Sequence, residues 1–498
     1  MVYQIYPRSF CDTTGNGVGD LEGIRRHLDH LVWLGIDAIW LSPFFTSPMF
    51  DYGYDVADYC DVDRLFGDLA TFDALVADAH ALGIRVIIDW VPNHSSIDHP
   101  WFVESRSSRD NPKRDWYVWR DPKPDGSLPN NWVESLTYGP AWTLDQTTGQ
   151  YYLHNFLPQQ PDLNWANPGL KTAMLDTLRF WLDRGVDGFR MDVVHMIGKD
   201  PELADEPPEF VGLPHDILNE QPETHVHLRD IRKVLDSYEG DRVAIGEIPL
   251  FDLDLMAGHY GDDDELHLVF NFPLIFAQWD ASQLRNVLTT TLAALEPRGA
   301  WPTWVLSNHD FPRHRTRYGG SEAYARAAAV LLLTLQGTPF MYAGEELGLL
   351  DAVIPPDRVR DPAGRDGCRA PLPWTAEPPH GWSTDTEPWL PWPPVPEHSN
   401  AEVLRDDPTS ILHLYHSILA LRRDTPALRL GGIGMLQTPP GVLAFQRGEG
   451  PEAVTVVVNF TEGHMPFDVA GVVALSTTRP ANDEFDGMLH PDEAVILR

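Results

Sequence analysis

Eight short apolar segments alternate with helical patterns over roughly the first 420 residues, and this alternation constrains the fold more than any other feature of the chain. Parallel strands need such an arrangement, because a crossover must follow each strand before the next can begin at the same edge of the sheet. Eight is also the number of strands that closes a barrel. The predicted strands are 2–6, 38–41, 86–89, 188–191, 243–245, 268–270, 303–306 and 340–342.

Several of the segments between these strands repeat apolar residues every three or four positions, which is the period of an amphipathic helix. Such patterns cover residues 69–82, 169–184, 284–295, 323–336 and 411–422. The sequence therefore predicts an α/β fold, a (β/α)8 TIM barrel, in which residues 1–94 and 165–425 form the catalytic domain.

Two regions depart from the alternation. Residues 95–164 are rich in Trp, Asn, Asp, Pro and Gly and lack periodicity, so we predict a loop subdomain inserted after the third strand, over the barrel mouth. Residues 351–400, dense in Pro and Trp, are predicted to form another loop at the same rim. Short alternating strands at 442–447, 454–460 and 494–497 predict a C-terminal antiparallel β-sandwich domain over residues 426–498.

The composition narrows the choice of partner. The formal net charge of −36 argues against a nucleic-acid partner, because affinity for nucleic acid depends on Lys and Arg neutralising phosphates. A hydrophobic content of 43% is ordinary for a globular protein and supplies a sizeable core. A neutral small molecule suits this acidic surface better than a polyanion does.

The cysteines and the N-terminal segment bear on the compartment. Cys11, Cys60 and Cys368 are widely spaced and odd in number, so they predict neither a disulfide framework nor a zinc cluster. The first ten residues, MVYQIYPRSF, lack the basic, apolar and small-residue pattern of a secretory signal. No window reaches about 18 uninterrupted apolar residues, so no membrane span is expected. The sequence predicts a cytoplasmic protein.

Acidic residues follow four of the predicted strands at the ends where barrel enzymes carry their chemistry. They are Asp89, Asp192, Glu247 and Asp310. Carboxylates that gather at one mouth repel each other and lose hydration, so a fold collects them for a reaction or for a metal. Two facing carboxyl groups are what glycoside hydrolysis requires, one to protonate the leaving oxygen and the other to attack the anomeric carbon or to activate water.

The strand period predicts how these groups relate to one another. Arg190 and Asp192 are two positions apart and therefore point the same way, so we expect the guanidinium to keep Asp192 ionised. Glu247 is expected to hold its proton near neutral pH, as a general acid must. Asp89, at a neighbouring strand end, is expected to orient Arg190 rather than to react. His195, three residues after Asp192, is expected to be a packing residue.

Four segments occur in one order at these strand ends: DWVPNH (89–94), GFRMD (188–192), GE (246–247) and SNHD (307–310). They resemble the signature segments of the α-amylase family, glycoside hydrolase family 13. QPDLN (160–164) is similar to the fifth segment in the α-glucosidase and oligo-1,6-glucosidase branch. The segments YQIYPRSF, GDLEGI, DYGYD and GRDGCRAPLPW resemble that branch as well.

The resemblance implies roles for the acids and for their neighbours. It makes Asp192 the nucleophile, Glu247 the acid/base and Asp310 the carboxylate that holds the 2- and 3-hydroxyls of the reacting glucose. It also implies further substrate-binding residues: His94, Arg190 and His309 beside that glucose, and Tyr54 with the charged pair Asp51 and Arg369 around its non-reducing end.

A possible cation loop lies near the N-terminus. Residues 12–20, DTTGNGVGD, place oxygen donors at alternate positions, as loops for hard cations do. The loop resembles the calcium or magnesium loop of the same branch, which implies Asp12, Asn16, Asp20 and the Val18 carbonyl as ligands. Thr14 stands where that branch usually has Asn or Asp. No organic cofactor is implied.

The predicted function is that of a retaining, exo-acting α-glucosidase that hydrolyses short oligosaccharides of the maltose or isomaltose type through a covalent glucosyl-enzyme intermediate. Val193 resembles branch members that prefer α-1,6 bonds, so an oligo-1,6-glucosidase is an alternative. A transglucosidase or sugar isomerase of the same family is another. A non-catalytic, transporter-associated homologue is the alternative from a different class, although such proteins lose the catalytic carboxylates that this chain retains.

Overall fold

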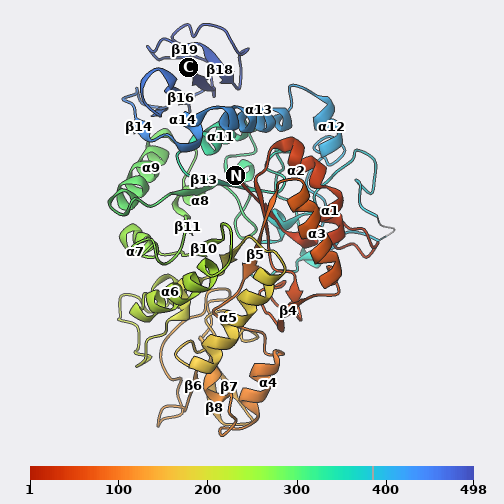
Figure 1. Ribbon diagram of the computed structural model, residues 1–498, viewed down its shortest axis with the longest axis vertical. Coiled ribbons are helices and arrows are strands. Elements are labelled where there is room, and N and C mark those ends of the chain that lie inside the picture. The colour runs from red at the N-terminus through yellow and green to blue at the C-terminus, as the bar shows by residue number, and fades with distance from the viewer. Residues whose placement is uncertain (384–385) are drawn as a thin grey trace.

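A computed structural model describes residues 1–383 and 386–498, and eight parallel strands form one sheet at its centre (Figure 1). The predicted (β/α)8 barrel is confirmed. Each predicted strand is present, within two residues at either end. The strands are β1 (Val2–Ile5), β2 (Ala38–Leu41), β5 (Arg85–Trp90), β9 (Gly188–Met191), β10 (Val243–Glu247), β11 (Leu268–Phe270), β12 (Thr303–Val305) and β13 (Thr338–Tyr342).

A threonine side chain closes the barrel between β11 and β12. The sheet runs β11-β10-β9-β5-β2-β1-β13-β12, so these two strands are its first and last members. The Thr303 hydroxyl donates to the Val269 carbonyl at 2.6 Å and accepts from the Asn271 N–H at 3.1 Å. The hydroxyl thus satisfies backbone groups of β11 where no backbone ladder joins the two strands.

Side chains alternate between the inside and the outside of the barrel, as the strand period requires. Inward-pointing Trp40, Ile87, Ile245, Phe270 and Phe340 belong to one apolar cluster that fills the barrel. The residues between them point outward and pack against the surrounding helices in a second, larger cluster. Two positions beyond Ile87 and Ile245 along their strands, the next inward side chains are acidic, so the apolar filling ends at a charged mouth.

Helices surround the sheet, and their caps set their boundaries. Asp280 caps α9 by accepting from the N–H groups of Ser282 and Gln283, so that helix begins three residues before the apolar pattern predicted. The main helices are α1 (Leu21–Arg26), α2 (Leu28–Leu34), α3 (Leu69–Ala81), α5 (Pro168–Asp183), α6 (Pro222–Asp236), α7 (Leu253–Gly258), α9 (Ala281–Leu295), α11 (Glu322–Thr334) and α13 (Ile411–Asp424).

The region predicted as a loop subdomain has regular structure of its own. Helix α4 (Pro100–Ser107) and the antiparallel strands β6 (Trp119–Arg120), β8 (Gln150–Leu153) and β7 (Trp142–Asp145) lie within residues 95–164. The side chains of Trp132 and Trp142 are buried in a separate apolar cluster there. The sequence predicted an inserted subdomain but not its strands, because strands of two to four residues are too short to show a period. We propose residues 95–164 as the extent of this subdomain.

The C-terminal part is an antiparallel sheet of five strands, in the order β14 (Ile433–Met435), β15 (Val442–Arg447), β16 (Val454–Asn459), β20 (Ala494–Leu497) and β18 (Val473–Ser476). One face, with Val456 and Ile496, joins the core of the barrel. The other face is covered by Phe467, Phe485 and Leu489, which lie on or beside the two-stranded sheet of β17 (Met465–Pro466) and β19 (Met488–Leu489).

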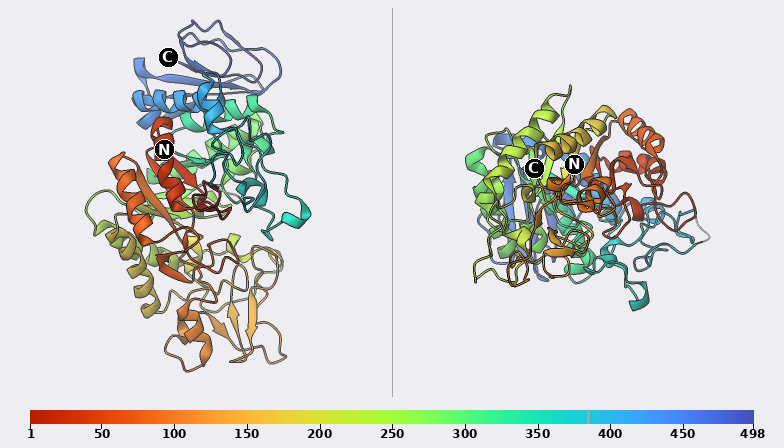
Figure 2. Two further views of the ribbon diagram at one scale, coloured as in Figure 1. Left: turned by 90° about the vertical axis from the view of Figure 1, so that its right-hand side faces the viewer. Right: turned by 90° about the horizontal axis from the view of Figure 1, so that it is seen from below.

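The barrel separates the two additional parts of the chain. In Figure 1 and in the left view of Figure 2 the C-terminal sheet lies at one end of the molecule and strands β6 to β8 lie at the other. We propose residues 426–498 as the C-terminal domain. None of the helices in residues 1–383 and 386–498 has the length and apolar character needed to cross a membrane.

The role of Thr303 in closing the barrel can be tested by Thr303→Val. Valine keeps the shape but leaves the Val269 carbonyl and the Asn271 N–H without a partner inside the protein, which should destabilise it by about 1 to 3 kcal/mol. Thr290→Val on the exposed face of α9 is the matched control. Thermal unfolding of both variants measures the effect, and equal melting temperatures would show that the hydroxyl does not close the barrel.

Candidate active site

The carboxyl ends of the strands open into a cavity of about 610 Å³. Asp192, Glu247 and Asp310 all line it, following β9, at the end of β10 and after β12 respectively. The remaining walls come from the inserted region, from the loop between β9 and α6, and from the segment after β13. The barrel therefore brings the three predicted catalytic carboxylates to one cavity.

Arg190 is the centre of the reactive end of this cavity. Its Nη1 atom lies 2.9 Å from Asp89 Oδ1 and 2.7 Å from Asp192 Oδ1, and its Nη2 atom lies 2.5 Å from Glu247 Oε2. The guanidinium carbon is 5.1 Å from the centre of the Trp40 ring. Only 1% of the arginine side chain is exposed, so one buried cation holds three carboxyl groups at the inner end of the cavity.

The electrostatics of this group differ from the sequence-based expectation. Burial and the neighbouring Glu247 carboxylate raise the pKa of Asp192 well above its usual range, although Arg190 opposes them. Burial likewise raises the pKa of Asp89 to about 7, against the same arginine. Arg190 therefore favours the ionised form of Asp192, as the sequence predicted, but burial and the neighbouring carboxylates oppose it.

The backbone after the nucleophile position is strained. Val193 has φ +36° and ψ +43°, a left-handed conformation that costs a β-branched residue energy. This conformation lets the Val193 N–H donate to Glu247 Oε2 at 3.1 Å. The turn therefore positions Glu247 against β9 and places the valine side chain on the cavity wall.

A second cluster of charges lies around Asp310. Arg365 and Arg369 each place one nitrogen 3.2 Å from Asp310 Oδ1. Burial acts to raise the pKa of Asp310, but the positive groups around it, chiefly His309 and these two arginines, outweigh burial and lower it. Because His309 is itself neutral at neutral pH, we attribute the ionised state of Asp310 there to the arginines.

The expected pairing of Asp51 with Arg369 is incorrect. Arg365 contacts Asp51 Oδ1 at 2.7 Å and also bonds Asp361, whereas the Arg369 Nε atom donates to the His309 carbonyl at 2.7 Å. The two arginines follow one another by four residues on a short helical turn, so the sequence motif contained both without showing which one reaches Asp51.

The histidines and Tyr54 link the two charged clusters. The Gln4 side-chain amide lies 2.7 Å from His309 Nδ1, and the Tyr54 hydroxyl lies 2.6 Å from His309 Nε2 and donates to Asp89 Oδ2 at 3.1 Å. Burial lowers the pKa of His309 to about 3, so this ring is neutral. The rings of Tyr54 and His309 are stacked, with centres 5.4 Å apart.

Gln160 is a site residue to which sequence reasoning gave no role. Its side-chain amide lies 3.0 Å from Asp51 Oδ2 and 3.1 Å from His94 Nε2. It therefore positions two of the predicted glucose-binding residues at once. The sequence did mark this position, because Gln160 is the first residue of the QPDLN segment (160–164) that resembles the fifth family segment. Burial lowers the pKa of His94 to about 4, so His94 is also neutral near pH 7.

The outer cavity contains aromatic and acidic side chains that no motif marked. Phe251 and Phe276 are 71% and 48% exposed, and Phe276 packs edge to face on Phe311 at 5.1 Å, so apolar rings are open to solvent at the mouth. Asp216, from the loop between β9 and α6, is a fourth carboxyl on the wall. Its Oδ1 atom has no hydrogen-bond partner among the described residues, and burial raises its pKa to about 6.

Three further side chains close to the motifs lie outside the cavity. His195 is fully buried, and its Nε2 atom lies 2.7 Å from the Asp216 carbonyl, which agrees with a packing role. Arg313 donates to the Ala343 carbonyl at 2.9 Å, and Arg317 donates to backbone carbonyls that include Pro312. The two arginines therefore fasten loops together.

The N-terminal loop is closed by its own hydrogen bonds. Asp12 accepts backbone N–H groups of the loop at 2.8 to 2.9 Å, Asn16 accepts from the Val18 N–H at 2.8 Å, and Asp20 caps α1 through the Gly23 N–H at 2.7 Å. Every side chain predicted as a ligand thus accepts hydrogen bonds from backbone N–H groups of the protein. Calcium or magnesium binding stays a prediction.

Comparison with known proteins gives a consistent family assignment. Residues 4–431 match the family model described as alpha amylase, catalytic domain. A protein of Rhizobium meliloti (strain 1021) named "Probable alpha-glucosidase" is 44% identical over 492 residues, which cover 93% of this chain and 89% of that protein. An oligo-1,6-glucosidase of Parageobacillus thermoglucosidasius is 37% identical, over 93% of this chain and 90% of its own.

Solved structures with the same fold include enzymes that transfer or rearrange sugars. The crystal structure of an alpha-glucosyl transfer enzyme aligns with a TM-score of 0.92 and 40% identity, over 100% of this chain and 98% of that one. The trehalulose synthase of Pseudomonas mesoacidophila MX-45 aligns with a TM-score of 0.94 and 34% identity, again over 100% and 98%.

The raised pKa of Asp192 predicts that its charge destabilises the folded protein. The Asp192 side chain favours folding only while it is protonated, so its contribution is present below the unfolded pKa of about 4 and is lost as pH rises through the folded pKa. Asp192→Asn should therefore raise the free energy of unfolding by about 1 to 2 kcal/mol at pH 8. Thermal unfolding between pH 4.5 and 8.5 should show the gain shrinking towards acid.

Asp310→Asn is the matched control, and its effect should have the opposite sign. The lowered pKa means that the Asp310 charge stabilises the fold above the unfolded pKa of about 4, and that this contribution is lost as pH falls further. Asp310→Asn should therefore melt below the wild type at pH 7. Identical pH dependence in the two variants would contradict the electrostatic account of both clusters.

Proposed function

The chain belongs to the α-amylase family, glycoside hydrolase family 13, and on that premise we propose that it is a retaining, exo-acting α-glucosidase. Its substrates are short α-glucosides of the maltose or isomaltose type, from which it removes glucose at the non-reducing end. One observation carries the proposal. Arg190 contacts both Asp192 and Glu247 at the inner end of the cavity, and the opposite wall contains the cluster of Arg365 with Asp51 and Asp310.

The positions of Asp192 and Glu247 support a retaining mechanism. Both carboxylates contact one guanidinium, which supports the short separation of about 5 to 5.5 Å typical of retaining enzymes. Their contacts with Arg190 use Asp192 Oδ1 and Glu247 Oε2. Asp192 Oδ2 is then available to attack the anomeric carbon, and Glu247 Oε1 is available to carry the transferable proton.

In the first step Asp192 forms a bond to the anomeric carbon while the bond from that carbon to the leaving oxygen breaks. Glu247 passes its proton to that oxygen, so the departing sugar leaves as a neutral alcohol. In the second step Glu247 removes a proton from water, the water oxygen attacks the same carbon, and Asp192 leaves as a carboxylate. Glucose is released with the α-configuration, and Glu247 is again protonated.

The surplus of buried negative charge has a function in this scheme. The transition state of glycoside cleavage is an oxocarbenium ion, which carries positive charge at the ring. While Glu247 holds its proton, the carboxylates of Asp89 and Asp192 still outnumber Arg190, so a cation that develops beside them relieves their repulsion. Electrostatic stabilisation of this kind acts more strongly in the transition state than in the ground state.

The contacts of Arg365 support exo action. It joins Asp51 to Asp310 across the cavity, at 2.7 and 3.2 Å, and both aspartates line the space where the sugar would lie. Charged side chains at these positions can hydrogen-bond the hydroxyls of a terminal glucose, and they leave little room for a chain to continue. A terminal residue suits this end of the cavity better than an internal one.

A second candidate function is glucosyl transfer or sugar isomerisation. It is favoured by the likeness to solved structures of an alpha-glucosyl transfer enzyme and of a trehalulose synthase. The exposed rings of Phe251 and Phe276 at the mouth would stack on an acceptor sugar and keep it near the intermediate. The choice between water and sugar as acceptor then depends on this outer region, and so does the choice between α-1,4 and α-1,6 bonds.

Product analysis tests the function directly. The purified protein is incubated separately with maltose, isomaltose, sucrose and soluble starch, and the products are followed by chromatography and by NMR of the anomeric protons. We expect α-glucose as the first product from a disaccharide, with starch nearly unchanged and no turnover by Asp192→Ala. First-formed β-glucose would exclude retention. New disaccharides in place of glucose would favour the transfer function.

The acid role of Glu247 predicts a dependence on the leaving group. Glu247→Gln removes the transferable proton while it keeps the shape, so cleavage of maltose or isomaltose should fall by about 100-fold or more. Cleavage of 4-nitrophenyl α-glucoside should fall much less in its first step, because its leaving group needs little protonation. Pre-steady-state bursts on both substrates measure that step, and equal losses would remove Glu247 from the acid role.

A further inference from the structure

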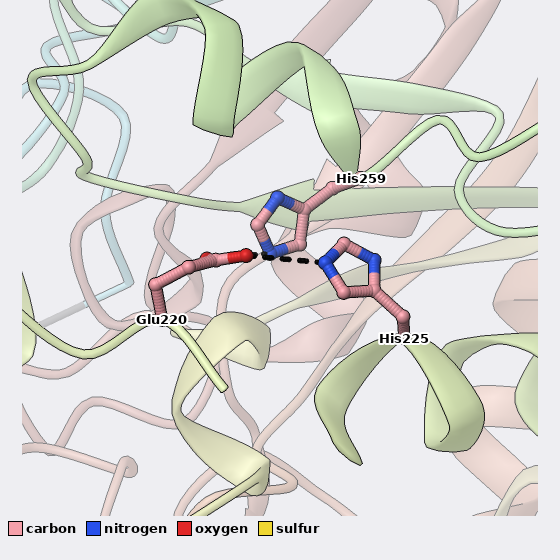
Figure 3. Close-up of side chains that lie close together, drawn as sticks. All are labelled: Glu220, His225 and His259. Atoms are coloured by element: carbon pink, nitrogen blue, oxygen red, sulfur yellow. Dashed lines mark hydrogen bonds and ion pairs between the residues drawn. The ribbon is translucent and has the colours of Figure 1, made fainter. Parts of the chain in front are cut away.

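Three potential metal ligands converge beside the catalytic mouth, in a place that no sequence motif marked. Glu220 ends the loop between β9 and α6, His225 lies in the first turns of α6, and His259 follows α7. Figure 3 shows the two imidazole rings and the carboxylate turned towards one another from these separate segments. Their nearest ligand atoms all lie within 4.8 Å of each other.

The hydrogen bonds of His259 leave a lone pair directed at this group. Its Nδ1 atom lies 3.0 Å from the Leu255 carbonyl, which can only accept, so Nδ1 carries the hydrogen. The Nε2 atom then faces Glu220 Oε2 at 3.7 Å, which is too long for a hydrogen bond. Neither atom has a hydrogen-bond partner among the described residues, although His259 is completely buried. Two acceptors that face each other in this way call for a cation between them.

His225 is oriented as metal-binding histidines are. Its Nδ1 atom lies 2.7 Å from Glu265 Oε2, and Arg229 in turn holds Glu265 Oε1 at 2.7 Å. A carboxylate behind the ring fixes a hydrogen on Nδ1, as it does behind metal-binding histidines. On the other side Nε2 hydrogen-bonds Glu220 Oε1 at 3.1 Å, and the two carboxylates raise the pKa of His225 to about 9, so a metal ion would take the place of the proton between Nε2 and Glu220.

We propose that Glu220, His225 and His259 form a zinc site. Two neutral imidazoles and one carboxylate are a donor set that zinc accepts, with a fourth position left for water. Ligand atoms of a tetrahedral zinc ion with bonds of about 2.0 Å lie roughly 3.3 Å apart. Two separations in this group are close to that value: Glu220 Oε1 lies 3.1 Å from His225 Nε2, and Glu220 Oε2 lies 3.7 Å from His259 Nε2. Glu220 and His225 are partly exposed, which gives the ion a path from solvent.

The ion would connect two segments that shape the active site. The loop that ends at Glu220 carries Leu213 to Ile217, part of the cavity wall, and helix α7 follows the strand that ends in Glu247. Zinc would fasten that loop to α7 and fix the outer wall relative to the catalytic carboxylates. The inference rests on the ligand geometry alone and would survive a change in the assigned substrate.

Metal binding by the full-length protein tests the proposal. After treatment with a chelator and its removal, the protein is titrated with ZnCl2, and bound zinc is counted by elemental analysis. Cobalt(II) added in place of zinc reports tetrahedral coordination through its visible absorption. We expect one zinc per chain and a higher melting temperature with zinc. Glu220→Gln and His259→Gln should each weaken binding by about 10-fold or more.

Glu223→Gln is the matched control, since Glu223 is an exposed glutamate on the same helix. It should bind zinc as the wild type does. Glu220 is partly exposed, so Glu220→Gln keeps the test valid if the buried His259→Gln fails to fold. Failure of the wild type to bind one zinc per chain would overturn the proposal. Equal affinities of Glu220→Gln and Glu223→Gln would show that the bound ion lies elsewhere.

Discussion

The hold of one buried guanidinium on three carboxyl groups is the interaction on which the rest of this site depends. Without Arg190, the carboxylates of Asp89, Asp192 and Glu247 would face one another with no cation between them, and their repulsion would act to separate β5, β9 and β10 at the mouth. With Arg190 in place, the three carboxyl groups stay together, although one guanidinium does not neutralise all of them. The barrel withstands the remaining repulsion among these carboxyl groups. The apolar layers below the mouth and the hydrogen-bonded pairing of the strands fix the positions from which the side chains project.

Positive charge is more plentiful on the Asp310 side of the cavity. There Arg365 and Arg369 offset two of the three charges of Asp51, Asp310 and Asp361, and the neutral rings of His309 and Tyr54 join this cluster to Asp89. A glucose ring placed between the two clusters would meet ionised hydrogen-bonding groups at its hydroxyls and an unneutralised negative field at its anomeric carbon. In the proposed mechanism, recognition and chemistry would thus take place at different ends of one cavity, and the number of arginines in each cluster would account for the difference.

The sequence predicted the barrel and its acidic mouth because both follow from local rules. A buried parallel strand is a short apolar run, and a polar residue after such a run lies at the mouth. The inserted sheet was missed because strands such as Trp119–Arg120 are too short to show alternation. The pairing of Asp51 with Arg365 was missed because 314 residues separate them and two arginines were equally available. Asp216 and the Glu220, His225 and His259 group follow no periodic pattern, since loop geometry alone brings them together.

The residues that sequence reasoning missed lie mainly around the outer part of the cavity, and there is a physical reason for this. The residues proposed to bind the reacting glucose lie mainly at strand ends, whose positions the barrel determines, so short motifs are enough to find them. In the proposed function the second sugar or the attacking water would meet Asp216, Phe251 and Phe276, which lie in the loops after β9 and β10 and at the end of α8 (Pro273–Phe276). The folding of a loop depends on distant partners such as His259, so its sequence alone does not show what it will contact. A family with one catalytic barrel can therefore contain both hydrolases and transferases, because the residues that choose the acceptor lie in segments that the barrel does not constrain.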